Sequence, residues 1–185
     1  MSDLVAPRAA PSFSLRRFWE RRKNTVAVIG GLVLYALVSD AILTSQGAEA
    51  VRFRIDLSPL LRIPSVLQAH IAGAILSFLI GTVLLLGVKG RTFHRVLGYV
   101  WVVTMAVTVV SSFFLVGLNG NSYSFIHLLS GWSVIVLPMA LAAAWRRDIR
   151  KHSKEMTGLF VGGMVIAGLF SFLPGRFMWH LFFTV

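Results

Sequence analysis

Long apolar stretches separated by short basic loops constrain this chain more than any other feature. They cover residues at about 25–44, 65–88, 93–118, 124–145 and 155–173. A helix needs roughly 20 predominantly apolar residues to cross the hydrocarbon core of a bilayer. Because backbone polar groups in lipid must be paired within their own segment, each stretch is expected to be a helix. The sequence therefore predicts an all-α membrane protein with five transmembrane helices.

Composition supports a membrane location and excludes several kinds of cofactor. Of the 185 residues, 56% are hydrophobic, which leaves a water-soluble domain too little polar surface to cover its core. The chain has no cysteine, so disulfides, iron–sulfur clusters and covalently attached haem are excluded. Most of the cations behind the net charge of +11 flank the apolar stretches, where membrane insertion explains them. We therefore expect membrane lipids as partners, and no nucleic acid.

The positions of the basic residues predict the orientation. Residues 1–24 form a basic arm that ends in Arg21, Arg22 and Lys23, and Lys and Arg are enriched in cytoplasmic segments. The N-terminus is accordingly expected in the cytoplasm, followed by a first transmembrane helix at 25–44. This pattern predicts a multi-pass protein of the bacterial inner (cytoplasmic) membrane.

Two shorter segments are expected at the opposite surface. Residues 45–64 carry three arginines, and their apolar residues alternate with polar ones from Val51 to Leu57. Such alternation predicts a short extended or interfacial segment across the mouth of the bundle. Its arginines would meet lipid headgroups or, alternatively, haem propionates or an anionic substrate. Residues 174–185 are predicted to form an aromatic interfacial tail.

Four histidines lie at or near the start of four different apolar stretches. They are His70, His94, His127 and His152, with 24 positions between the first two and 25 between the last two. Because successive spans run in opposite directions, His70 and His127 should lie at one surface, and His94 and His152 at the other. Paired imidazoles can hold a b-type haem between helices. The pattern predicts one metal-ligating pair near each surface.

The spacing also indicates a two-helix repeat within residues 65–173. His-Ile-Ala-Gly at 70–73 corresponds to His-Leu-Leu-Ser-Gly at 127–131, and both histidine offsets are 57 or 58 positions. The repeat predicts a central four-helix bundle. Gly73 and Gly131 are candidate positions for close approach of a haem, although close helix packing is the more common reason for small residues in membrane helices. Taken singly, His94 and His152 would be expected to face headgroups, and only the joint pattern favours haem.

These observations lead to two functional hypotheses. The first is transmembrane electron transfer by a membrane oxidoreductase or electron-transfer subunit that holds haem b, up to two copies, and receives electrons from a quinol or a periplasmic donor. A quinone is a further candidate ligand. The second is a haem-free small accessory or scaffold subunit of a larger respiratory or photosynthetic complex. A coupled transporter is disfavoured because none of the seven acidic residues lies in the middle of a predicted span.

Several motifs together resemble a known sequence family. They are His70, Lys89-Gly90, His94-Arg95 with Gly98, His127, His152 with Met156, and Phe172-Leu173-Pro174-Gly175-Arg176. This set resembles the predicted membrane proteins called domain of unknown function 2306, over about residues 65–176. The resemblance implies a membrane protein and supplies no activity.

A weaker similarity is to cytochrome b-561, whose central four helices each carry one haem-ligating histidine. It implies pairing of His70 with His127 and of His94 with His152, with two b haems that relay electrons. The chain departs from that class in having five predicted spans rather than six. Its cytoplasmic histidines are also shallower, and the residues that bind ascorbate in that class have no assured match here.

Overall fold

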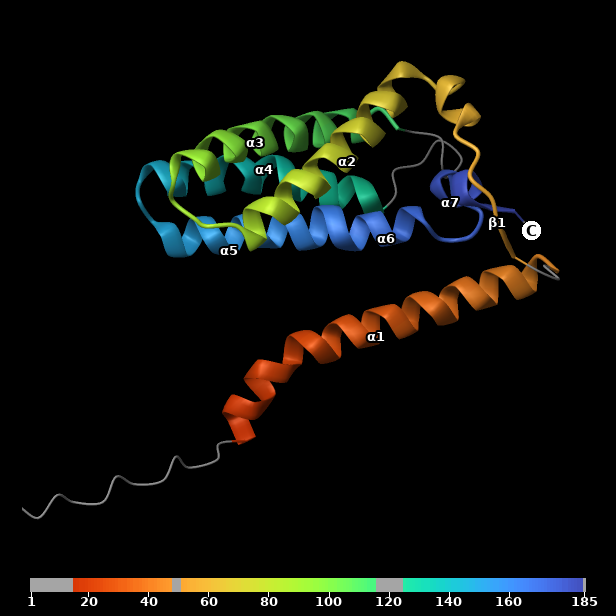
Figure 1. The fold of residues 1–185 in the computed structure, drawn as a ribbon, viewed down its shortest axis with the longest axis horizontal. Helices are drawn as coiled ribbons and strands as arrows, with labels where there is room; N and C mark the ends of the chain where they lie inside the picture. Colours follow the sequence, from red (N-terminus) through yellow and green to blue (C-terminus); the bar gives the residue numbers. More distant parts are fainter. Residues whose placement is uncertain (1–14, 48–50, 116–124, 185) are drawn as a thin grey trace, which may run out of the picture. The chain divides into compact units, whose positions relative to one another are not determined.

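The computed structural model describes residues 15–47, 51–115 and 125–184, which are mostly helical (Figure 1). The helices are α1 (Leu15–Ser45), α2 (Ser65–Leu86), α3 (Thr92–Ser112), α4 (Phe125–Trp145), α5 (Ile149–Leu159), α6 (Ala167–Ser171) and α7 (Phe177–Phe182). The other described elements are a 3-10 turn, η1 (Ser58–Leu61), a π-helix, η2 (Phe160–Ile166), and two short strands, β1 (Arg52–Phe53) and β2 (Phe183–Thr184). The chain forms two compact units, divided after Gly47.

Three of the described helices are long and apolar enough to cross a membrane: α2, α3 and the part of α4 from His127 to Trp145. Residues Ile29–Ser45 form a shorter apolar helix within α1. The molecule is therefore an α-helical, multi-pass membrane protein, as its hydropathy pattern predicts. The count of five spans and the orientation stay predictions.

Helix α1 begins at Leu15, inside the segment predicted to be a basic arm. Residues 15–23 contain no glycine or proline and are rich in arginine, and long unbranched side chains favour helix. Hydropathy marks only the apolar part of such a helix, so α1 extends further towards the N-terminus than the transmembrane span predicted at 25–44.

The second unit contains a bundle of α2, α3, α4 and the run formed by α5, η2 and α6. Helix α2 packs against α3, α3 against α4, and α4 against α5, while η2 contacts both α2 and α4. The bundle core consists of Trp101, Met105, Val109, Val136, Leu137, Leu159, Phe160 and Met164. These side chains fill the middle of the bundle. The four histidines lie at its two ends.

The fifth predicted span is interrupted by the π-helix η2. Figure 1 shows α5 and α6 as parts of one continuous helical run, with η2 between them. Gly162 and Gly163 lie within η2, and a Cβ atom added at Gly163 would come within 2.9 Å of Met105 Cε on α3. The fifth helix thus approaches α3 closely at a point where its winding is wider than in an α-helix.

Residues 51–63 and 177–184 together form a small structure that we call the cap. Strand β1 pairs antiparallel with β2, with Arg52 opposite Thr184 and Phe53 opposite Phe183. The Arg54 N–H extends the pairing by donating to the Phe182 carbonyl at 2.9 Å. The extended segment predicted from alternation is present, but its partner, the aromatic tail, could not be predicted because the pairing joins distant parts of the chain.

Candidate functional site

The small residues of α2 form its contact with α3. A Cβ atom added at Gly73 would lie 2.7 Å from Thr108 Oγ1 and 3.2 Å from the Thr104 carbonyl oxygen. One turn further, Ser77 Oγ donates to Thr104 Oγ1 at 2.9 Å, and the Ser77 carbonyl accepts from Trp101 Nε1, also at 2.9 Å. Helix α3 therefore occupies the space beside Gly73 that was considered for a haem.

Gly131, the counterpart of Gly73 in the predicted repeat, has different surroundings. No described residue comes within 4 Å of a Cβ atom added there. Of the two glycines considered for close approach of a cofactor, only Gly131 leaves room.

His70 is held against α3 by its Nδ1 atom. This nitrogen lies 2.9 Å from the Thr108 carbonyl oxygen and 3.2 Å from Ser111 Oγ. Because a carbonyl can only accept, we assign the ring proton to Nδ1, which donates to Thr108. The lone pair of the neutral imidazole is then on Nε2, the atom available to a metal.

His127 lies at the same end of the bundle, on α4. Its side chain is buried, including the Nε2 atom. Three residues later, Ser130 Oγ accepts a hydrogen bond from Ser112 Oγ at 2.6 Å. A polar patch on α3, formed by Thr108, Ser111 and Ser112, thus contacts both helices that carry the first predicted histidine pair.

The second predicted pair lies at the opposite end. His152 Nδ1 is 3.0 Å from the Ala140 carbonyl oxygen of α4, so it is anchored to a neighbouring helix in the same way as His70. His94 is half-buried and lies close enough to His152 and Lys89 to interact with them electrostatically. The fold thus places both histidines of this pair at the end of the bundle that carries the basic loops.

Anchoring through Nδ1 is how proteins usually orient a histidine that binds a metal through Nε2. Within the described ranges, no group of three or more His, Cys, Asp or Glu side chains is placed to hold a metal ion. A bare ion with three or four protein ligands is therefore not indicated among these residues. A b-type haem needs only two axial imidazoles, so this result does not bear on the predicted histidine pairs.

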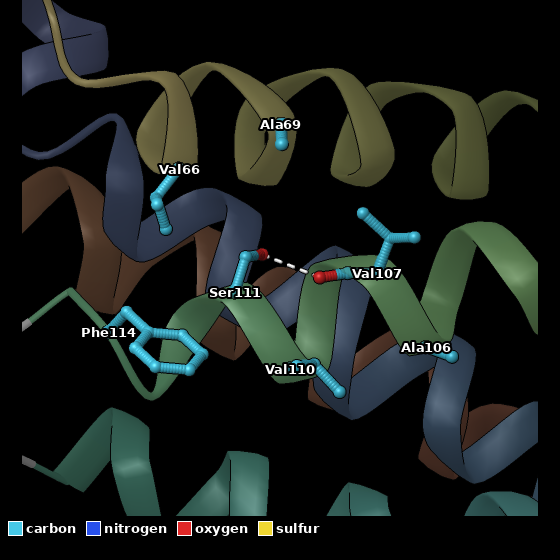
Figure 2. A pocket seen from close by; sticks show the side chains of 7 residues that line it. All are labelled: Val66, Ala69, Ala106, Val107, Val110, Ser111 and Phe114. Carbon is cyan, nitrogen blue, oxygen red and sulfur yellow. Dashed lines mark hydrogen bonds between the residues drawn. The ribbon is translucent and has the colours of Figure 1, made fainter.

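An apolar groove lies next to His70, between α2 and α3. It has a volume of about 460 Å³ and is lined by Val66, Ala69, Ala106, Val107, Val110, Ser111 and Phe114. Figure 2 shows Ser111 in its wall, hydrogen-bonded to the Val107 carbonyl. Since the same hydroxyl lies 3.2 Å from His70 Nδ1, it connects the groove to the histidine.

Sequence reasoning found the histidines but missed the groups that hold them. The Thr108 and Ala140 carbonyls are main-chain atoms and leave no trace in residue type. The patch itself could have been found, because Thr104, Thr108, Ser111 and Ser112 recur at helical spacing in an otherwise apolar stretch. Polar residues on one face of a membrane helix indicate a buried contact.

Comparison with known proteins identifies the family of the chain. It belongs to the family described as predicted membrane protein (DUF2306), whose model matches residues 67–183. This match confirms the similarity seen in the motifs and includes all four histidines of the repeat. No curated protein and no solved structure matches the chain, so the similarity to cytochrome b-561 has no support from these comparisons.

Proposed function

We propose that this member of the predicted membrane protein family transfers electrons across the bacterial inner membrane through non-covalently bound b-type haem. His70 and His127 would provide axial ligands near one surface, and His94 and His152 near the other. The proposal includes five transmembrane helices with the N-terminus in the cytoplasm.

The observation that supports this function best is the shared anchoring of His70 and His152. Each ring, from a different half of the predicted repeat, contacts a main-chain carbonyl of the adjacent helix through Nδ1, at 2.9 and 3.0 Å. A histidine that served only as a headgroup contact would gain little from being fixed to a neighbouring helix. Fixed rings with Nε2 available are what axial ligation requires.

The roles of the chain's residues follow from their positions. A bound haem would supply reversible one-electron chemistry. At 1.5 Å of rise per residue, the helix from His70 to the loop at Lys89 separates the two histidine levels by roughly 25–30 Å. Trp101, Met105 and Leu159 are buried between these levels and exclude water from that space. A quinol or a periplasmic protein is the expected electron donor.

Absorption spectra of the purified full-length protein from haem-replete cells test the proposal. We expect a Soret band and α bands that sharpen on reduction. His70→Ala and His94→Ala should each remove about half of the bound haem, because each variant loses one ligand of one pair. His180→Ala is the matched control, since His180 is exposed in the tail and lies outside the repeat. A colourless wild-type protein would reject the function.

A haem-free accessory or scaffold role is the second candidate, and the glycines favour it. Gly73, Gly81 and Gly163 are closely contacted by neighbouring helices, whereas Gly98, Gly131 and Gly168 have no described atom within 4 Å of an added Cβ atom. Small residues on open faces allow a further helix to pack closely. Purification of the protein only as part of a large complex, without cofactor, would favour this role.

A further inference from the structure

A hollow at the junction of α4 and α5 combines apolar and charged walls. It has a volume of about 250 Å³ and is lined by Met139, Ala142, Ala143, Arg146, Asp148 and Lys151. The three apolar residues belong to the last turns of α4, a helix able to span a membrane. Arg146 and Asp148 lie in the turn that follows, and Lys151 lies in the first turn of α5. The hollow therefore lies where hydrocarbon gives way to water.

The turn between the two helices fixes the shape of this hollow. Arg147 adopts a left-handed conformation, with φ of 60°, which ends α4. The N–H groups of Arg146, Arg147 and Asp148 donate to the carbonyls of Ala142, Ala144 and Ala143, respectively. These bonds satisfy the last carbonyls of α4, as in other helix ends with a left-handed residue.

The charges in the wall are unequal. Asp148 is engaged by α5, because its Oδ1 accepts from the Lys151 backbone N–H at 3.1 Å. Among the residues that the structure describes, neither Arg146 nor Lys151 forms an ion pair, and both are exposed. Two cations thus remain available beside one carboxylate that is already hydrogen-bonded.

We propose that this hollow binds the phosphate of an anionic phospholipid. Arg146 and Lys151 would contact the phosphate, and the first methylenes of an acyl chain would lie along Met139 and Ala142. Basic hollows at the cytoplasmic ends of transmembrane helices suit such headgroups, because the lipid supplies both the charge and the apolar chain. A free phosphate ion would use the cations but leave the apolar wall without a partner. The site is independent of electron transfer.

Lipid titrations of the delipidated full-length protein in nonionic detergent test this site, with native mass spectrometry as the readout. Dioleoyl phosphatidylglycerol should bind at least tenfold more tightly than dioleoyl phosphatidylcholine. Arg146→Gln combined with Lys151→Gln should weaken phosphatidylglycerol binding about tenfold or more, since each basic residue near a headgroup adds to the attraction. The matched control is Arg150→Gln combined with Lys154→Gln, which removes the same charge from exposed residues outside the hollow.

Two further measurements distinguish a lipid site from a site for a soluble anion. Ala142→Leu, which fills the hollow and keeps every charge, should also weaken phosphatidylglycerol binding several-fold. Millimolar inorganic phosphate should compete poorly with the lipid. Equal losses in the two double variants would show a diffuse charge effect and overturn the proposal. Strong competition by phosphate would show that the hollow takes a soluble anion, and tight phosphatidylglycerol binding that survives Ala142→Leu would show that the lipid does not occupy the hollow. Either result would also overturn the proposal.

Discussion

The two ends of the four-helix bundle use the same anchor for a histidine in very different surroundings. At one end, His70 is fixed to α3 beside the Ser111 hydroxyl, and the first segment of the cap, residues 51–63, directly precedes α2 along the chain. At the other end, His152 is fixed to α4 next to the basic loops, and Lys89 interacts with His94.

The difference shows which features are set by packing and which by charge. The contact between Nδ1 and a carbonyl recurs because a polar ring between membrane helices requires a partner and the neighbouring main chain supplies one. The surroundings differ because Lys and Arg are more numerous in the loops beside His94 and His152 than in residues 51–63, which carry Arg52, Arg54 and Arg62. The end with His70 is thus ordered by hydrogen bonds between helices, and the end with His152 also carries most of the basic residues of the bundle.

The largest expected contrast between the ends concerns two glycines, one near each level of histidines. Gly73→Ala should lower the free energy of unfolding by about 1–3 kcal/mol, because the new Cβ atom would overlap Thr108 Oγ1. Gly98→Ala should raise it by about 0.5–1 kcal/mol, because the site is open among the described residues and alanine favours helix. Unfolding by SDS in mixed micelles measures both. Equal effects would contradict the close packing of α2 on α3.

The histidines provide a smaller contrast. His70→Ala should destabilise the haem-free protein by about 1–2 kcal/mol, because it removes a partly buried hydrogen bond between two helices. His94→Ala should cost less than about 0.5 kcal/mol, since its ring is only half-buried and has no described hydrogen bond. The same SDS titration, on protein from haem-depleted cells, separates this structural effect from loss of cofactor. A larger loss in His94→Ala would reverse the proposed difference between the ends.

The smallest effect is expected in the cap, as a dependence on pH. The Ser58 hydroxyl and backbone N–H, together with the Arg54 guanidinium, hold the pKa of Asp56 below its ordinary value of 3.8. A lowered pKa in the folded state means that the stabilisation is complete above the unfolded pKa and is lost as the pH falls through the folded pKa.

Thermal melting of wild-type protein and Asp56→Asn measures this dependence. The wild-type Tm should exceed that of the variant at pH 6, and the gap should close below about pH 4. A gap that stays constant with pH would show that the carboxylate charge does not stabilise the cap.

Much of the fold was predictable because membrane helices are encoded locally. The length of the apolar stretch predicts the start of α2 at Ser65. The tryptophan at position 145 marks the end of α4, and the glycine at position 90 marks the turn at Lys89-Gly90. The left-handed glycine at position 90 confirms the turn, with φ of 80°. The π-helix was not predicted, since Gly162-Gly163 is equally compatible with a regular helix.

The candidate site was predictable in its residues and not in its contacts. Regular spacing places His70 with His127 and His94 with His152, because antiparallel spans return to the same surface. It cannot show that α3 fills the space beside Gly73 and leaves Gly131 open, since that depends on which helix faces meet.

The sequence by itself determined that this chain is a multi-pass helical membrane protein with histidines at the ends of its bundle. The lengths of the apolar segments and the positions of the charged residues suffice for that, since each segment in lipid must form the hydrogen bonds of its own backbone. Only the tertiary structure decided how the His70 and His152 rings are held, where Gly131 leaves space, and that the tail pairs with residues 52–53. These features depend on contacts between distant segments, which arise from the shapes of packed surfaces and not from the residue types of any one segment.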